Sequence, residues 1–253
     1  MSSRVDRDIF LSIVIPAYNE AGVIERTVNS VREYCAYTQF TWEIIAVDDG
    51  SDDDTAERAQ HALRGVENAR VIRNAHNHGK GWAVKEGMLS AKGKYRLFMD
   101  ADNSTPIEHW EKAWPLFEMG ADVVIGSRAI KGAVLVESQP WYRRTLGVLG
   151  NAYAQLVLLN GITDSQCGFK CFSAQAAESI FTRVTTRRWA FDIEVLALAR
   201  AMKYEIDEFP VRWTRGKRSS VKFGDYLGAF FDTLRIVSHI RKEFPYYKNI
   251  KNI

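Results

Sequence analysis

Short apolar runs alternate with segments of helical spacing along the first half of the chain. Each run is continuous, as expected for a strand that is buried on both faces of a parallel sheet. The segments between the runs place apolar residues three or four positions apart, which indicates amphipathic helices. We therefore predict strands over residues 11–15, 43–47, 69–73, 95–99 and 122–126, and helices over residues 20–37, 53–63, 81–91 and 107–119.

This alternation predicts an α/β fold with a Rossmann-like, mostly parallel central sheet and helices on both faces, whose ligands bind at the carboxyl ends of the strands. The rhythm changes after residue 128, but nothing there indicates a separable domain, so we expect one domain over residues 1–253. Pro210 favours an edge position for the last strand. The expected elements of this second half are a mobile loop over 131–140, a helix over about 141–159, strands over 168–172 and 204–213, and helices over 191–202 and 221–244.

The composition is that of an ordinary globular protein, with 46% hydrophobic and 26% charged residues among 253. The net charge of +3 is too small to argue for a nucleic-acid partner, but it is unevenly distributed. Residues 212–253 hold ten Lys/Arg and three Asp/Glu, a charge of +7, which leaves −4 on the remainder. A basic end on a mildly acidic body indicates an anionic partner there. The odd count of three cysteines fits a reducing compartment, and no signal peptide or transmembrane helix is expected.

Polar clusters follow three of the predicted strands. Asp100-Ala101-Asp102 follows the run over 95–99, while residues 16–20 (Pro-Ala-Tyr-Asn-Glu) and 47–51 (Val-Asp-Asp-Gly-Ser) follow the first two runs. Two carboxylates one residue apart present hard oxygen ligands to a divalent cation. The alternative for Asp48, Asp49 and Asp52 is that they cap the following helix. Together the three clusters point to a nucleotide-sugar site.

The ordered motifs resemble those of the inverting GT-A glycosyltransferases of family 2, over about residues 12–222. Within that family the chain looks most like enzymes that transfer a sugar to a polyprenyl phosphate. Two stretches, 79–81 and 166–170, look more like the dolichyl-phosphate glucosyltransferases than their mannosyl relatives. The motifs that carry the resemblance are residues 16–20, 47–51, Gly79-Lys80-Gly81, 100–102, Gly126-Ser127-Arg128 and 164–170 (Asp-Ser-Gln-Cys-Gly-Phe-Lys).

The resemblance implies a donor-binding half over about residues 10–128. Asp100 and Asp102 would hold Mg²⁺ or Mn²⁺ against the donor diphosphate, with Asp102 the first choice for direct coordination, and Asp49 would contact the base. Lys80 either approaches the diphosphate or is a solvated lysine in a glycine turn. The donor-site residues implied by the resemblance are Pro16, Ala17, Tyr18, Glu20, Val47, Asp49, Lys80, Asp100, Ala101, Asp102, Arg215 and Lys222.

The resemblance also implies an acceptor half over about residues 129–222. A polyprenyl phosphate is already ionised near neutral pH, so it needs cations to position it instead of a general base. Arg128, Arg143, Arg144 and Gln166 are the expected acceptor-phosphate residues, and Arg128 joins Asp100 and Asp102 in the expected catalytic set. If the acceptor is a sugar hydroxyl, Asp192 is the candidate base.

Residues 221–253 form the expected amphipathic, basic C-terminal helix and tail. Its apolar stripe fits either a peripheral contact with the cytoplasmic face of a membrane or packing on protein. A mannosyltransferase using GDP-mannose, a hydroxyl acceptor, a non-catalytic nucleotide-sugar-binding module or partner subunit, and a homo-oligomer stay open. A nicotinamide dehydrogenase is excluded, because no G-x-G-x-x-G follows the first strand. The sugar, the base, the metal, the prenyl length and the downstream pathway are not fixed by the sequence.

Overall fold

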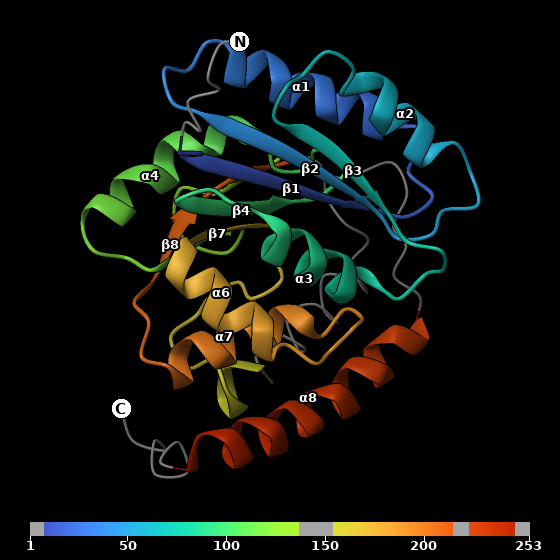
Figure 1. The fold of residues 1–253 in the computed structure, drawn as a ribbon. Helices are drawn as coiled ribbons and strands as arrows, with labels where there is room; N and C mark the ends of the chain where they lie inside the picture. The colour runs from blue at the N-terminus through green and yellow to red at the C-terminus, as the bar shows by residue number, and fades with distance from the viewer. Residues whose placement is uncertain (1–7, 137–153, 215–222, 246–253) are drawn as a thin grey trace.

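A seven-stranded, mixed sheet forms the centre of the computed structural model (Figure 1), which describes residues 8–136, 154–214 and 223–245, except the side chains of 223–227, 229 and 230. Neighbouring strands follow the order β3-β2-β1-β4-β7-β5-β8. All neighbours are parallel except β7, which runs antiparallel between β4 and β5. The strands are β1 (Leu11–Ala17), β2 (Trp42–Asp48), β3 (Ala69–Arg73), β4 (Tyr95–Met99), β5 (Val123–Ser127), β7 (Phe169–Ser173) and β8 (Ile206–Pro210).

Helices cover both faces of this sheet, as the sequence predicts (Figure 1). Two apolar clusters of buried side chains fill the two interfaces between the sheet and the helices. One face carries α1 (Ile24–Ala36), α2 (Thr55–Ala62), the short 3₁₀ helix η1 (Ile107–His109) and α4 (Trp110–Glu118); the other carries α3 (Lys80–Ser90), α6 (Ala174–Arg183), α7 (Phe191–Ala201) and, outside them, α8 (Phe223–Glu243).

The central strands are buried because each presents apolar side chains to both faces. Every residue of β1, β4 and β5 is buried, which matches the continuous apolar runs from which they were predicted. Strand β8 lies at one end of the sheet order, so the edge position expected from Pro210 is confirmed.

The second half differs from the sequence prediction in three places. The single strand expected over 204–213 is two strands, β8 in the main sheet and β9 (Arg212–Trp213) in a separate two-stranded sheet. Part of the expected loop over 131–140 is a strand, β6 (Val134–Leu135), which pairs in parallel with β9. Helix α6 was not predicted, although Ser173 caps it by accepting a hydrogen bond from Ala176 N. Most of the helix expected over 141–159 lies outside the described residues.

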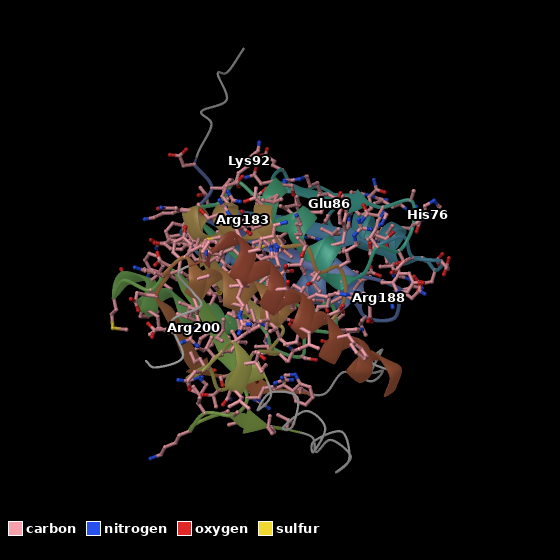
Figure 2. The ribbon with its side chains drawn as sticks, turned by 90° about the horizontal axis from the view of Figure 1, so that it is seen from below. His76, Glu86, Lys92, Arg183, Arg188 and Arg200 are labelled. Carbon is pink, nitrogen blue, oxygen red and sulfur yellow. The ribbon has the colours of Figure 1, made fainter. Side chains whose placement is uncertain are left out.

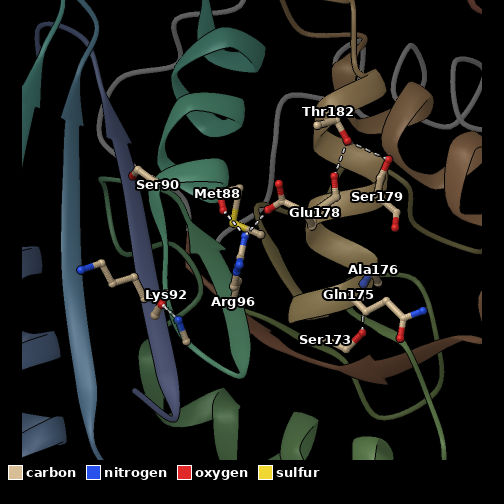
Figure 3. A network of polar contacts seen from close by, with 12 residues as sticks. Met88, Ser90, Lys92, Arg96, Ser173, Gln175, Ala176, Glu178, Ser179 and Thr182 are labelled. Carbon is tan, nitrogen blue, oxygen red and sulfur yellow. Dashed lines mark hydrogen bonds and ion pairs between the residues drawn. The ribbon is translucent and has the colours of Figure 1, made fainter. Parts of the chain in front are cut away.

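A buried arginine ties two helices to the sheet (Figure 3). Arg96 on β4 is 9% exposed, and its Nη1 donates to the Met88 carbonyl of α3 at 2.8 Å. The same nitrogen lies 3.2 Å from the Glu178 carboxylate of α6. Both contacts are made by Nη1 and partly offset the cost of burying the charge, whereas Nε is buried without a hydrogen-bond partner among the described residues. The two contacts connect α3 and α6 to β4, the strand that leads to Asp100.

Candidate active site

Asp100 and Asp102 lie at the carboxyl end of β4, next to the end of β1. The Asp100 backbone N–H donates to the Gly168 carbonyl at 3.1 Å, and the Ser104 N–H donates to Asp102 Oδ1 at 2.9 Å. A Cβ at Gly168 would lie 1.8 Å from Asp100 Oδ2. The Asp100 carboxylate therefore occupies the space that any other residue at 168 would fill. Burial raises the pKa of Asp102, and the neighbouring Asp100 charge raises it further.

Lys80 joins this pair from α3. Its Nζ lies 2.6 Å from Asp100 Oδ1, and its side chain is 21% exposed. The rings of Trp189 and Phe191 flank the ammonium, with centroids 5.4 and 5.9 Å away. Burial alone would lower the pKa of Lys80, but Asp100 and Asp192 outweigh it and raise that pKa. Lys80 is not the freely solvated lysine that the sequence left as an alternative.

Asp49 shapes the turn from which Lys80 emerges. Its carboxylate accepts hydrogen bonds from the backbone N–H groups of His78 (3.1 Å) and Gly79 (2.7 Å) and from Asn74 Nδ2 (3.2 Å). Gly79 has φ +102°, a conformation that favours glycine. The contact between Asp49 and a base stays a prediction.

The helix-capping alternative for this acidic cluster is wrong. The Thr55 N–H, in the first turn of α2, bonds Asp53 Oδ1 at 3.0 Å, whereas Asp48, Asp49 and Asp52 make no capping bond to it. Asp48 is 1% exposed and has Arg73 Nε 3.6 Å away.

The remaining donor-site candidates divide by exposure. Tyr18 is 40% exposed and its hydroxyl lies 3.5 Å from Asp52 Oδ2. Pro16 and Ala17 end β1, and Glu20 is half-buried just before α1. Val47 and Ala101 are buried, so only their backbone groups could meet a ligand. Arg215 and Lys222 lie outside the described residues.

Arg128 at the end of β5 is held by Asp164. Its Nε and Nη2 donate to the two Asp164 oxygens at 2.7 and 2.9 Å, and its backbone N–H adds a third bond at 2.9 Å. Burial alone would raise the pKa of Asp164, but the guanidinium outweighs it and holds that pKa below its usual range. Arg128 stays 26% exposed and lies against the Trp213 ring. Gln166 is exposed, and its backbone N–H donates to Asp164 Oδ1 at 3.1 Å. Arg143 and Arg144 lie outside the described residues.

Asp192 is buried and paired with a buried lysine. Lys170 on β7 is fully buried, and its Nζ lies 2.5 Å from Asp192 Oδ1 and 2.6 Å from the Cys167 carbonyl. Asp192 itself is 3% exposed, and burial raises its pKa despite the lysine. A carboxylate that is already paired and cut off from solvent is poorly placed to take a proton from a substrate.

Sequence reasoning gave no role to Asp164, Gly168, Lys170 or Trp189, although the first three lie within a quoted motif. Two signals in the sequence could have indicated these roles: Lys170 stands inside an apolar run, and Gly168 directly precedes that run. The pairs Lys170–Asp192 and Arg128–Asp164 each join residues at least 22 positions apart, so they become visible only in the folded structure.

The carboxylate pair fits a divalent cation that is shared with a diphosphate. Asp102 sits in a desolvated position beside a second carboxylate, where added positive charge would be favourable. Among the described residues no cluster of three or more His, Cys, Asp or Glu could hold a metal. Mg²⁺ commonly binds through one or two carboxylates plus substrate phosphates, and two carboxylates are what the site offers.

Curated proteins that are similar to this chain are named dolichyl-phosphate β-glucosyltransferases, the group that the motifs resemble. The chain is 34% identical to dolichyl-phosphate β-glucosyltransferase ALG5C of Trichomonas vaginalis, over 92% of this chain and 72% of the relative. It is 36% identical to the Drosophila melanogaster dolichyl-phosphate β-glucosyltransferase over 81% of this chain and 67% of the relative. The human protein of that name is 34% identical over 89% of this chain and 74% of its own length.

Solved structures show the same fold. Glucosyl-3-phosphoglycerate synthase from Mycobacterium tuberculosis, in complex with Mn²⁺, UDP and phosphoglyceric acid, matches with a TM-score of 0.67 at 20% identity. That match covers 92% of this chain and 78% of the other. The architecture is therefore GT-A-like. The model of the family described as "Glycosyl transferase family 2" matches residues 12–181, and the chain belongs to that family.

Proposed function

We propose that this glycosyltransferase moves glucose from UDP-glucose, with inversion, to a polyprenyl phosphate, using Mg²⁺ or Mn²⁺. The curated relatives are named for a dolichyl-phosphate acceptor and a β-glucosyl product, which supports the lipid phosphate and the sugar. Solved structures of the same fold contain UDP-glucose or UDP with Mn²⁺ or Mg²⁺, which supports the base and the metal.

The observation that carries the proposal is the burial of Asp192 against Lys170. A hydroxyl acceptor needs a general base to remove its proton, whereas a phosphate monoester has a second pKa of about 6 and is already a nucleophile. Asp192 was the candidate base for a hydroxyl, and it is 3% exposed with its charge already paired. This favours the acceptor that needs no base.

The donor side of the reaction follows from Asp100, Asp102 and Lys80. The two carboxylates would hold the divalent cation, which neutralises the charge that develops on the departing diphosphate. An acceptor phosphate oxygen attacks the anomeric carbon of the glucose from the face opposite the leaving group. As that bond forms, the bond from the anomeric carbon to the UDP oxygen breaks, and UDP leaves with the electron pair. No proton has to move in this step.

The acceptor side of the proposal rests on Arg128. Asp164 fixes the orientation of its guanidinium through two bonds, and its planar shape suits phosphate oxygens. The proposal also assigns Gln166, Arg143 and Arg144 to the acceptor phosphate, and Arg215 and Lys222 to the donor phosphates.

Helix α8 carries the proposed contact with a membrane surface. Its inner face packs on the domain through Ile236 and Ile240, which are 1% and 0% exposed. Arg183, which is labelled in Figure 2, places its Nε 2.8 Å from Glu243 at the C-terminal end of the helix. Phe231 and Leu234 are 59% and 48% exposed, and Arg235, Arg241 and Lys242 are exposed too. Aromatic and basic side chains together suit an anionic lipid surface. In the described ranges, no helix is both long and apolar enough to cross a membrane.

The test is product formation by the purified chain with Mn²⁺ or Mg²⁺, a short polyprenyl phosphate and either UDP-glucose or GDP-mannose. We expect metal-dependent transfer from UDP-glucose, and no product from Asp102→Ala. Transfer from GDP-mannose alone would replace the glucosyl assignment with the mannosyl one. Donor binding without lipid product from either nucleotide would refute the phosphate acceptor.

A further inference from the structure

Lys80 occupies the position where added positive charge is most needed in the proposed donor site. Its Nζ lies 2.6 Å from Asp100 Oδ1, and the Asp102 charge also acts on it. The ammonium partly offsets two neighbouring carboxylates that would otherwise repel each other. The Asp100–Asp102 pair is thus already partly neutralised by a side chain of the protein itself.

The nearby buried acid does not compete for this lysine. Asp192 raises the pKa of Lys80, so its charge reaches the ammonium, but Lys170 holds Asp192 at 2.5 Å. Lys170 itself is fully buried and is fixed a second time by the Cys167 carbonyl. With Asp192 paired to Lys170, Asp100 is the carboxylate in ion-pair contact with Lys80 among the described residues, and Asp102 adds its charge.

The Lys80 ammonium makes one ion pair among the described residues, with Asp100. Its side chain is 21% exposed, and the ring faces of Trp189 and Phe191 beside the ammonium attract a cation without fixing it in one direction. A lysine has a flexible four-carbon stem, so its ammonium can exchange one anion for another nearby.

We propose that Lys80 is a placeholder cation: it neutralises Asp100 until a divalent cation and the donor diphosphate arrive together, and then exchanges the carboxylate for a diphosphate oxygen. The inference rests on the proposed function, because it requires a metal at Asp100 and Asp102. Without nucleotide, a metal that takes Asp100 as a ligand competes with Lys80 for this carboxylate and weakens the pairing of the ammonium. With nucleotide, the diphosphate supplies the replacement.

The exchange couples the two ligands. Metal binding to the nucleotide-free protein is weakened by the lysine, and nucleotide binding to the metal-loaded protein is strengthened by it. Because such coupling is reciprocal, UDP should raise the affinity for metal by the same factor by which the metal raises the affinity for UDP.

The test measures Mn²⁺ binding directly, by the electron paramagnetic resonance signal of free Mn²⁺, with and without saturating UDP. We expect Lys80→Met to bind Mn²⁺ about tenfold or more tightly than the parent protein when UDP is absent, as for the loss of one charged hydrogen bond. With UDP present the variant should lose that advantage and bind UDP more weakly. Lys80→Arg keeps the charge and should keep the weak nucleotide-free Mn²⁺ affinity.

Lys85→Met is the matched control, because Lys85 lies on the same helix and its Nζ contacts the Val184 carbonyl at 2.7 Å, outside the carboxylate cluster. It should leave both Mn²⁺ affinities unchanged. Thermal unfolding of each variant checks that it is folded. A damaged fold would weaken Mn²⁺ binding, whereas the placeholder role predicts a gain.

Equal or weaker nucleotide-free Mn²⁺ binding by folded Lys80→Met would overturn the inference and leave the proposed function intact. Failure of the parent protein to bind Mn²⁺ even with UDP would overturn the metal-dependent function, and the inference with it.

Discussion

Replacing Gly168 by alanine should strongly lower the rate of glucosyl transfer while leaving the protein folded. The added Cβ would lie 1.8 Å from Asp100 Oδ2 and 2.5 Å from Oδ1, closer than real Cβ atoms approach any neighbour. The Gly168 backbone is not in the left-handed region, so the conflict is one of space and not of backbone strain. The Asp100 side chain is 30% exposed, so we expect the carboxylate to rotate away and the backbone to stay in place.

The size of the effect follows from that displacement. The carboxylate must retreat by about 1 Å or more, and a misplacement of this size costs roughly 10²-fold in rate. Moving Asp100 also breaks its contact with Lys80. We expect the free energy of unfolding to fall by only about 1–3 kcal/mol, as for other overpacked sites.

The assay compares initial rates of lipid product formation for Gly168→Ala and the parent protein, with thermal unfolding measured in parallel. Gly228→Ala is the control, since a Cβ there would meet no atom within 4 Å. A Gly168→Ala enzyme that is as fast as the parent would refute the argument, because it would mean that the position of Asp100 does not matter.

Three further changes test the buried contacts. Lys170→Met should lower the free energy of unfolding by about 3–5 kcal/mol, because it leaves Asp192 buried without its partner; urea unfolding measures this, and adding Asp192→Asn should recover part of the loss. A single variant as stable as the parent would contradict it. Arg128→Met removes the partner of Asp164, whose pKa is lowered in the folded protein. The pair therefore stabilises the fold fully above the unfolded pKa of about 4, and this stabilisation is lost as the pH falls through the lower, folded pKa. The unfolding temperatures of parent and variant should converge in acid, and a pH-independent gap would count against the pair. Ile240→Ala should cost about 2–5 kcal/mol, since this side chain is fully buried between α8 and the domain; unchanged urea unfolding would show that α8 is not part of the cooperative core.

The parallel half of the fold could be predicted because its strands are buried on both faces. A strand such as β1, buried at all seven positions, leaves a continuous apolar run in the sequence. Polar residues directly after such runs lie at the carboxyl edge of a parallel sheet, so the apolar pattern by itself predicts that Asp49 and Asp100 lie along the same edge.

The antiparallel insertion was harder to foresee. The run that forms β7 indicates a strand, but nothing in it states that the strand lies between β4 and β5 or that it runs antiparallel. Helix α6 was missed although its buried residues, Ala176, Ala177, Ile180 and Phe181, have helical spacing after the Ser173 cap. A two-residue strand such as β6 leaves no periodicity to detect.

The pairings within the site depend on tertiary structure. Lys170 sits in an apolar run, where a lysine could not be assigned a partner, and the fold brings Asp192 to it from α7. Arg128 was predicted as a phosphate ligand from its motif, while the carboxylate that orients it lies 36 positions away. The candidate residues could be predicted from the sequence, whereas the packing of the fold shows which carboxylates are already paired with a cation.

The most direct test of the central claim is whether a phosphate oxygen is the nucleophile. Purified protein is incubated with UDP-glucose, Mn²⁺ or Mg²⁺, and either a short polyprenyl phosphate or the polyprenol of the same length. The masses of the lipids are then measured by mass spectrometry. We expect the polyprenyl phosphate to gain the mass of one hexose and the polyprenol to remain unchanged. A hexose on the polyprenol, or on neither lipid while UDP-glucose is bound, would contradict the account.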